Sequence, residues 1–268
     1  MGDLSQVGCV IMAGGEGSRL GFEGPKGLFP LQGRTLFAHL CEPIAGSDRF
    51  VAVMTSPKND VATKDYFKRC DYFGLKNLHF FSQTMAPLLD EFGHVCGEAP
   101  DGNGSVFRAF MALEERCREQ GIRELQLAAI DNPLSHLFDS QLIGFHQQEE
   151  ADATVSCVRR DPGNSMGLLA EREGRIAIVE YSEVTPEKLD SGLYPYGNAG
   201  RWVVDFDLVC AMAKVEMPWH WAHKRGLWKR EKFLIDVLLY AERGRTLCFS
   251  RERSYRPIKS LQDVESVL

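Results

Sequence analysis

The chain has 268 residues, 44% of them hydrophobic, so it can bury a core for one large domain or two small ones. Its formal net charge of −6 argues against nonspecific binding to nucleic acid or to an anionic membrane surface. No apolar run approaches the roughly 20 residues that span a bilayer, and we expect no secretory signal. The eight cysteines contain no Cys-x-x-Cys pair, which is typical of reduced thiols. Composition therefore predicts a soluble cytoplasmic protein.

Short apolar runs alternate with amphipathic stretches along the chain. The pattern predicts strands over 7–13, 50–55, 78–82, 125–130 and 153–158, and helices over 35–45, 60–70, 105–120, 139–149 and 231–243. A hairpin is predicted over 166–180 with its turn at Glu173-Gly174, and 214–230 is predicted to be a mobile loop. This alternation predicts an α/β fold with a doubly wound, mainly parallel, Rossmann-like sheet that helices cover on both faces.

The most distinctive segment follows the first predicted strand and reads Met12-Ala-Gly-Gly-Glu-Gly-Ser-Arg-Leu-Gly-Phe-Glu-Gly-Pro-Lys26. Its glycines at 14, 15, 17 and 21 allow tight turns and a close approach of backbone N–H groups to an anion. Arg19 and Lys26 add two cations to the same loop. The segment therefore predicts a loop that holds the phosphates of a nucleotide triphosphate.

Other interpretations of this loop fit its sequence less well. A dinucleotide-binding turn requires Gly-x-Gly-x-x-Gly at the start of a helix, whereas here Gly21 comes one residue late and Pro25 soon follows. No Gly-Lys-Ser/Thr follows the glycines, so the loop does not match a Walker motif. An ordinary glycine-rich turn does not account for the combination of these glycines with Arg19, Pro25 and Lys26 at fixed spacing.

The string from Ala13 to Gly21, followed by Pro25-Lys26-Gly27, closely resembles the signature of the UDP-sugar pyrophosphorylases. The resemblance implies a nucleotide-diphospho-sugar transferase-like (GT-A-like) core. It also implies that the loop closes over the phosphates of UTP. The residues that it assigns to this role are Ala13, Gly14, Gly15, Gly17, Arg19 and Lys26.

Asp131-Asn132-Pro133 follows the predicted strand over 125–130. Ligands bind beyond the carboxyl ends of strands in open α/β sheets, and a carboxylate there is a suitable ligand for Mg²⁺. Taken alone, Asp131 could equally cap the next turn. Because the family has an Asp-Asn pair at this place, the resemblance makes Asp131 the expected metal ligand and nucleotide-binding residue.

Pro100-Asp-Gly-Asn-Gly104 precedes the predicted helix over 105–120, where Asp101 or Asn103 could serve as an N-cap. The resemblance instead implies that Gly102 and Asn103 contact uracil and ribose, and its Asp-Gly-Asn form points to the UDP-N-acetylhexosamine branch. Gln83 follows a strand where the family places a uracil-reading glutamine, since an amide can pair with both a carbonyl and an N–H group. On residue type alone, Gln83 could also be a solvent-facing strand end.

Three residues are expected to bind the sugar. Glu180, in Val179-Glu-Tyr-Ser-Glu183, stands where a carboxylate can accept hydrogen bonds from sugar hydroxyls, while Gly167 would let the sugar approach the backbone. Asn198 lies in a Gly-Asn element that resembles the family's sugar-binding element. The following Arg201-Trp202 departs from the family pattern, which leaves the sugar identity open.

Lys229 precedes Glu231-Lys-Phe233 and matches a family lysine that meets the phosphates from the opposite side, although it could also be one more cation in a basic cluster. His220 and His223 are three residues apart, but other ligands at zinc spacing are missing from the sequence around them. We therefore expect Arg19, Lys26 and Lys229 to be the catalytic residues.

The resemblance covers nearly the whole chain and implies one nucleotidyltransferase domain over 1–268, with a nucleotide-binding half over 1–150 and a sugar-binding half over 151–268. The expected reaction joins UTP and a sugar 1-phosphate, foremost N-acetylglucosamine 1-phosphate, with Mg²⁺ as cofactor. Alternatives are glucose 1-phosphate as acceptor, a noncatalytic UDP-sugar sensor, or an NAD-dependent oxidoreductase; the last lacks the expected acidic residue after the glycine loop. Known family members are longer, so the chain is either a minimal core or a trimmed form. We expect a monomer or a weak oligomer, without nucleic-acid or membrane partners.

Overall fold

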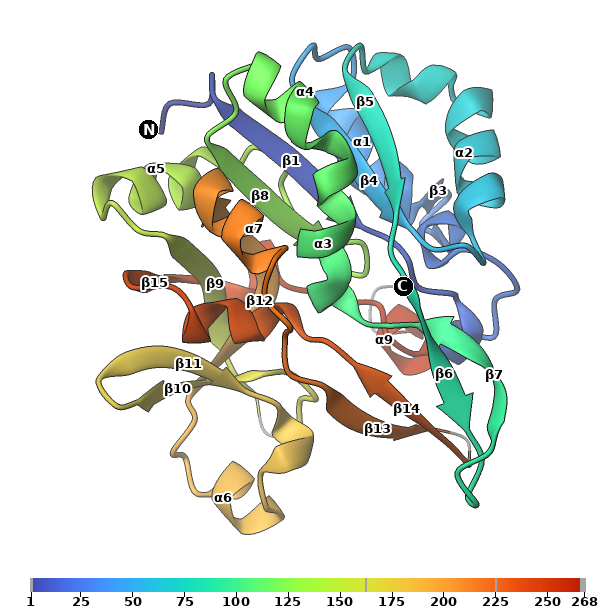
Figure 1. The fold of residues 1–268 in the computed structure, drawn as a ribbon, viewed down its shortest axis with the longest axis vertical. Helices are drawn as coiled ribbons and strands as arrows, with labels where there is room; N and C mark the ends of the chain where they lie inside the picture. The colour runs from blue at the N-terminus through green and yellow to red at the C-terminus, as the bar shows by residue number, and fades with distance from the viewer. Residues whose placement is uncertain (1, 162, 225, 266–268) are drawn as a thin grey trace.

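A nine-stranded sheet forms the centre of the computed structural model, which describes residues 2–161, 163–224 and 226–265 (Figure 1). Its parallel part has the order β8-β1-β4-β5, formed by β8 (Glu124–Ala129), β1 (Val7–Met12), β4 (Val51–Thr55) and β5 (Leu78–Ser82). Every residue of β1 and β4 is buried. Such uninterrupted burial explains why these strands are apolar throughout instead of alternating.

The rest of this sheet is mixed. The long strand β12 (Tyr196–Asp205) runs antiparallel to β8, to β9 (Ala153–Arg159) and to β10 (Leu168–Arg172). The remaining two strands are β11 (Arg175–Val179), which forms a hairpin with β10, and β15 (Gly244–Phe249), which runs parallel to β9.

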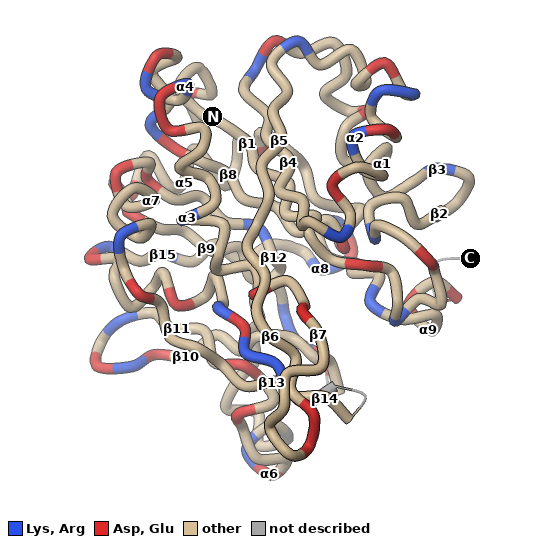
Figure 2. Tube along the Cα trace, turned by 45° about the vertical axis from the view of Figure 1, so that its right-hand side comes forward, with Lys and Arg blue, Asp and Glu red and all other residues tan. Residues whose placement is uncertain are grey.

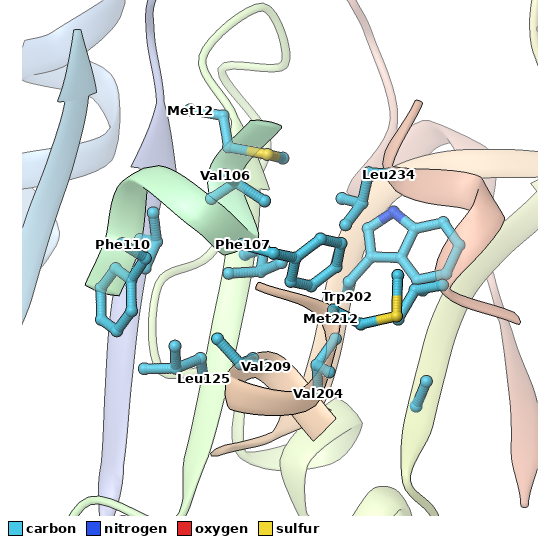
Figure 3. Packing of buried hydrophobic residues seen from close by; sticks show 14 of the residues in the cluster. Met12, Val106, Phe107, Phe110, Leu125, Trp202, Val204, Val209, Met212 and Leu234 are labelled. Atoms are coloured by element: carbon cyan, nitrogen blue, oxygen red, sulfur yellow. The ribbon is translucent and has the colours of Figure 1, made fainter. Parts of the chain in front are cut away.

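Helices cover both faces of the sheet and bury two hydrophobic clusters. One face carries α3 (Val106–Phe110), α4 (Glu114–Glu119) and α7 (Phe206–Met212); the other carries α1 (Leu36–Cys41), α2 (Asp60–Arg69) and α5 (Ser140–Gln148). Figure 3 shows the first cluster, in which Phe107 and Leu234 lie beside the indole of Trp202. Both signs of charge alternate along α2, α4 and the β10–β11 hairpin (Figure 2).

A second, four-stranded antiparallel sheet adjoins the parallel edge, with the order β13-β14-β6-β7. Its strands are β6 (Met85–Leu89), β7 (Val95–Pro100), β13 (His220–Lys224) and β14 (Leu227–Glu231). The smaller elements are β2 (Pro30–Leu31), β3 (Arg34–Thr35), α6 (Pro186–Asp190), α8 (Arg251–Ser254) and α9 (Leu261–Glu265).

The predicted α/β class with a mainly parallel sheet is confirmed, as are the five predicted strands and the hairpin turning at Glu173-Gly174. Of the predicted helices, 35–45 ends in a 3₁₀ turn at Pro43 and 105–120 is interrupted by a 3₁₀ turn over Met111–Leu113. The division into two halves stays a prediction. Within the residues that the structure describes, helices long and apolar enough to cross a membrane are absent.

Two predictions for the C-terminal third were wrong. The predicted loop over 214–230 contains the β13–β14 hairpin, apart from residue 225, which lies outside the described residues. The predicted helix over 231–243 begins with extended chain and continues as the 3₁₀ helix η8 (Leu234–Leu239). Lys232 is held extended because its N–H donates to the carbonyl of Asp101 (2.7 Å) and its carbonyl accepts from Gly104 (2.9 Å). A tertiary contact thus overrides the helical pattern.

Candidate nucleotide and sugar site

The glycine-rich loop, residues 13–26, begins where β1 ends, at the carboxyl edge of the parallel strands. A buried side chain fixes its path: Nδ2 of Asn59 donates to the carbonyls of Ala13 (2.9 Å) and Gly15 (3.1 Å). The Oδ1 atom of Asn59 accepts the N–H of Ser56 at 2.8 Å. Because Asn59 uses both ends of its amide, it ties the loop to the segment between β4 and α2. The motif search missed Asn59, since it lies 33 residues beyond the loop.

The loop also folds on itself. Gly17 donates to the carbonyl of Gly24 at 2.9 Å, and Lys26 donates through its backbone to Gly15 at 3.1 Å. Gly24 has a φ of 134°, a value that L side chains rarely adopt, so this turn requires glycine. A Cβ on Gly15, by contrast, would meet nothing within 4 Å. Gly15 therefore presents bare backbone to open space.

A cavity of about 530 Å³ opens in front of this loop, and we call it the nucleotide pocket. It is lined by Met12, Gly14, Gly15, Glu16, Ser18, Arg19, Met54, Gln83, Ala99, Pro100, Gly102, Asn103, Lys229 and Glu231. The lining combines apolar and polar groups in a volume typical of small-molecule sites. Seven residues predicted from widely separated motifs share it, namely Gly14, Gly15, Arg19, Gln83, Gly102, Asn103 and Lys229.

Gln83 lies directly on Gly14 at the apolar side of the pocket. It is buried (5% exposed), and a Cβ added to Gly14 would collide with its side-chain amide. The backbone of Gln83 donates to Thr55 at the end of β4, which fixes its position. Gln83 is thus no solvent-facing strand end.

The Asp-Gly-Asn-Gly segment packs against the chain after β14. Oδ1 of Asn103 accepts the N–H of Leu234 at 2.9 Å, while a Cβ on Gly102 would collide with the carbonyl of Lys232. Asp101 accepts a hydrogen bond from Thr84 at 2.5 Å. Neither Asp101 nor Asn103 caps α3, so the capping interpretation is wrong for that helix. Asn103 instead caps η8 and joins the two walls of the pocket.

A cluster of charges lies beyond the loop at the end of β8. Nζ of Lys26 is 3.7 Å from Oδ2 of Asp131, and the two side chains are 11% and 23% exposed. Burial lowers the pKa of Lys26, and the charge of Asp131 opposes that change. The cluster therefore keeps a positive and a negative group together in a partly desolvated place.

Lys259 joins this cluster from the segment before α9 and was missed by the sequence analysis. Nζ donates to the carbonyl of Ser165 at 2.9 Å. Burial lowers the pKa of Lys259, but Tyr255, Asp131 and Glu180 together raise it above its ordinary value. Its surroundings thus stabilise the charged ammonium of Lys259.

Asn132 explains how Lys259 reaches the cluster. Its Nδ2 donates to the carbonyl of Ser254 (2.8 Å), and its Oδ1 accepts from the backbone of Arg256 (3.0 Å). Ile258, which is fully buried, donates through its backbone to Asp131 at 2.7 Å. Asn132 is therefore a structural anchor for the segment that carries Lys259.

Lys229 lines the opposite wall of the nucleotide pocket on β14. Its Nζ is 2.7 Å from Oε1 of Glu231, and both side chains are about 15% exposed. A carboxylate thus balances this lysine within the pocket. Lys229 is not a cation of a solvated cluster.

The three residues expected to bind sugar lie together. The N–H of Asn198 donates to the carbonyl of Gly167 at 2.8 Å, and Oε1 of Glu180 is 3.7 Å from the position of a Cβ on Gly167. Burial raises the pKa of Glu180, and Lys259 opposes that shift. Oδ1 of Asn198 accepts from the N–H of Gly200 at 2.8 Å. These contacts link the three predicted residues to the Lys259 cluster.

Arg201 and Trp202 are buried in the core, each 1% exposed. Arg201 pairs with Asp139 at the start of α5 and stacks on Phe249 at 4.5 Å, while Trp202 packs near Leu234 (Figure 3). Their departure from the family pattern therefore changes the interior rather than a group beside Glu180.

A second cavity of about 950 Å³ shares Arg19 with the nucleotide pocket. Its lining includes Lys259, Tyr255 and Tyr181, the residue after Glu180. Arg19 thus lines both cavities, the nucleotide pocket and the cavity beside Lys259.

Asp131 was tested as a metal ligand. Among the described residues, a group of three or more histidine, cysteine or acidic side chains that could hold a metal is absent. Mg²⁺ needs no such group, because it is commonly bound by one or two carboxylates together with substrate phosphates and water. The partly exposed Asp131 carboxylate fits that arrangement.

Comparison with known proteins gives a consistent result. A protein of Encephalitozoon cuniculi named a probable UDP-N-acetylglucosamine pyrophosphorylase is 30% identical, over 96% of this chain and 82% of its own length. A Saccharomyces cerevisiae UDP-N-acetylglucosamine pyrophosphorylase is 31% identical, over 95% of this chain and 65% of its own length. The crystal structure of a Trypanosoma brucei uridine diphosphate N-acetylglucosamine pyrophosphorylase, in complex with an inhibitor, superposes with a TM-score of 0.83 at 27% identity, covering 98% and 65% of the two chains.

The chain thus spans about two thirds of the length of the yeast and trypanosome relatives. A family model described as UTP--glucose-1-phosphate uridylyltransferase matches residues 2–193. The resemblance to the UDP-sugar pyrophosphorylases is therefore confirmed, and the chain belongs to this family of uridylyltransferases.

Proposed function

We propose that this chain transfers UMP from UTP to a sugar 1-phosphate, foremost N-acetylglucosamine 1-phosphate, and releases pyrophosphate. The observation that carries the proposal is the shared lining of the nucleotide pocket. Gly14, Gln83, Asn103 and Lys229 reach one cavity from four separate segments at the carboxyl edge of the sheet. An anion-binding loop, a buried amide and a lysine that share one cavity are the groups that a nucleotide site requires.

In this reaction an oxygen of the sugar phosphate attacks the α-phosphorus of UTP. The bond from that phosphorus to the oxygen bridging to the β-phosphate breaks, and pyrophosphate leaves with its electron pair. The attacking group is already an anion, so alignment of the two oxygens and neutralisation of charge are the main requirements. Covalent catalysis is not needed.

Each predicted residue has a place in that scheme. Gln83, Gly102 and Asn103 hold the uridine, and the loop from Ala13 to Lys26, including Gly15 and Gly17, follows the phosphates. Arg19 and Lys26 neutralise the pyrophosphate side, and Lys229 meets the phosphates from the opposite wall. Lys259 neutralises the sugar phosphate, because its ammonium is close enough to feel the charges of both Asp131 and Glu180.

Glu180, Gly167 and Asn198 hold the sugar. Burial raises the pKa of Glu180 and so favours its protonated form. Lys259 and the hydroxyls of a bound sugar oppose this effect and favour the charged carboxylate. Names of relatives support the acetylated sugar, since the yeast and trypanosome proteins are both called UDP-N-acetylglucosamine pyrophosphorylases.

Members of this family generally use a divalent metal. Bound by Asp131, Mg²⁺ would supply positive charge to the phosphate oxygens during transfer. The protein's own part is to hold Asp131 next to Lys26 at the end of β8.

The test is pyrophosphate release from UTP, measured with N-acetylglucosamine 1-phosphate and with glucose 1-phosphate, each with Mg²⁺ and with a chelator. We expect release with the acetylated sugar and a lower rate with glucose. Preference for glucose would overturn the sugar assignment while keeping the reaction. Tight UTP binding without release for either sugar would overturn the proposed activity and favour a sensor.

A further inference from the structure

His220, at the start of β13, lies between carboxylates from two other elements. Its Nδ1 is 3.1 Å from Oε1 of Glu183, in the 3₁₀ turn η7 (Tyr181–Glu183), and its Nε2 is 2.9 Å from Oδ2 of Asp236 in η8. The ring stacks on Phe233 with centroids 4.5 Å apart. Both ring nitrogens thus face an acidic acceptor, and only the doubly protonated imidazolium can donate to both.

Further acidic groups surround this ring. Glu231 is directly opposite His220 in the β13–β14 register, and the charge of His220 lowers the pKa of nearby Glu180. Burial lowers the pKa of His220, but Asp236 and Glu183 outweigh burial, so the pKa lies above 6.5. Burial also raises the pKa of Asp236. Loss of the proton from His220 would leave these carboxylates without their shared cation.

The three elements that meet at His220 carry three sides of the site. Glu183 follows Glu180 of the sugar side by three residues. Asp236 belongs to η8, whose first N–H is accepted by Asn103. Opposite His220, Glu231 pairs with Lys229 in the nucleotide pocket. One ring therefore connects the uridine, phosphate and sugar sides.

We propose that the His220 imidazolium is a positioning residue that holds the β13–β14 hairpin, and with it Lys229, against the other two sides of the site. When His220 loses its proton, Nδ1 and Nε2 can no longer both donate. The hairpin then separates from η7 or η8, and Lys229 leaves its working position. This inference rests on the proposed function for its kinetic consequence, and on geometry alone for the hairpin itself.

Turnover gives the first test. His220→Gln and His220→Phe are compared with wild type and with His223→Gln, a control on the same strand, where the rings of His223 and Trp228 are 4.6 Å apart and tilted by 33°. A misplaced lysine should lower kcat by about tenfold to a hundredfold while the KM for UTP changes little. Wild type and His223→Gln should lose activity as pH rises through the His220 pKa, and both His220 variants should lack that limb. An unchanged limb in His220→Gln would overturn the proposal.

Two measurements separate this proposal from the proposed function, because neither needs turnover. NMR titration should give His220 a pKa above 6.5 in wild type and a lower one in Glu183→Gln, whose side chain is half exposed and should tolerate the change. Hydrogen exchange of the amides over 220–224 and 226–231, corrected for its intrinsic pH dependence, should accelerate above that pKa. A pKa at or below 6.5, or exchange independent of it, would overturn the positioning role even in an active enzyme.

Discussion

Nζ of Lys26 lies 3.7 Å from Oδ2 of Asp131, although one follows the glycine loop and the other follows β8. The two segments meet because β1 and β8 are parallel neighbours, so their carboxyl ends share one edge. A cation and a carboxylate, which we propose to serve the phosphates and the metal, are thereby placed next to each other. Each partly neutralises the other in this structure.

Removal of either residue should therefore impair the chemistry more than the fold. We expect Lys26→Ala and Asp131→Ala each to lower kcat by at least about a hundredfold. The first variant loses a cation that neutralises the transferring phosphate, and the second loses the carboxylate proposed to hold the metal that does so. Circular dichroism and gel filtration should match wild type. Near-normal turnover in both variants would remove the assigned roles.

Gly14 and Gly15 offer a matched pair for locating the nucleotide. A Cβ on Gly14 collides with Gln83, whereas a Cβ on Gly15 meets nothing within 4 Å. Gly14→Ala should raise the KM for UTP by displacing Gln83, and adding Gln83→Ala should have little further effect. Gly15→Ala should leave the melting temperature unchanged yet weaken UTP binding. Unaltered UTP affinity in Gly15→Ala would show that the nucleotide does not approach this backbone.

Asn59 should be important for stability without contacting substrate. Asn59→Ala leaves the Ala13 and Gly15 carbonyls without their donor, at a cost of about 2–4 kcal/mol in the free energy of unfolding. Urea denaturation measures this loss. Asn59→Asp is the informative control, because it keeps an acceptor for Ser56 but supplies no donor to the loop; equal stability of Asn59→Asp and wild type would contradict the role.

Glu180 should make the protein less stable as pH rises. Its pKa is raised by burial, so the folded protein holds this proton at pH values where the unfolded chain, near 4.5, has released it. Stability therefore falls as pH rises from about 4.5 through the raised folded pKa, and it stays lower above that pKa. Glu180→Gln should melt at a higher temperature than wild type at pH 7, but with a higher KM for the sugar phosphate. Thermal melts from pH 4 to 8 decide the first point, and a lower melting temperature for the variant would contradict it.

The Arg201–Asp139 pair should affect stability and leave sugar choice unchanged. Asp139→Asn strands a guanidinium that is 1% exposed, and we expect a loss of about 3–5 kcal/mol. Adding Arg201→Met should recover much of that loss, because it removes the stranded charge. The ratio of rates with the two sugar phosphates should stay at the wild-type value in Arg201→Met. A changed ratio would show that Arg201 does affect the choice of sugar.

Much of the site could be predicted because its motifs are local. Apolar strands followed by Gln83 or Asp131 indicate groups at one edge of a parallel sheet. The structure places Gln83 in the nucleotide pocket and Asp131 beside Lys26. Lys259 could not be found this way, because its position depends on the burial of Ile258 and on the bonds from Asn132. The sequence around Lys259 contains no pattern that predicts those contacts.

The two wrong predictions, for 214–230 and 231–243, also arise from contacts between separate segments of the chain. The segment over 231–243 has helical spacing of apolar residues, but backbone bonds from Asp101 and Gly104 hold Lys232 extended. The β13–β14 hairpin lacks a simple strand pattern, since His220 faces an acidic network while Trp221 is exposed. In both cases contacts with other segments of the chain, rather than the local spacing of residues, determine the conformation, and short-range patterns do not reveal them.

The pairing of β12 with β9 shifts register between Asn198 and Trp202. Asn198, which we propose to bind the sugar, precedes the irregular stretch, and the core residue Trp202 follows it. Because alternate residues of a strand point to opposite faces, deleting one residue in the irregular stretch would turn one end over relative to the other. We therefore expect homologues that bind different sugars to differ over 198–202 by substitution rather than by insertion or deletion.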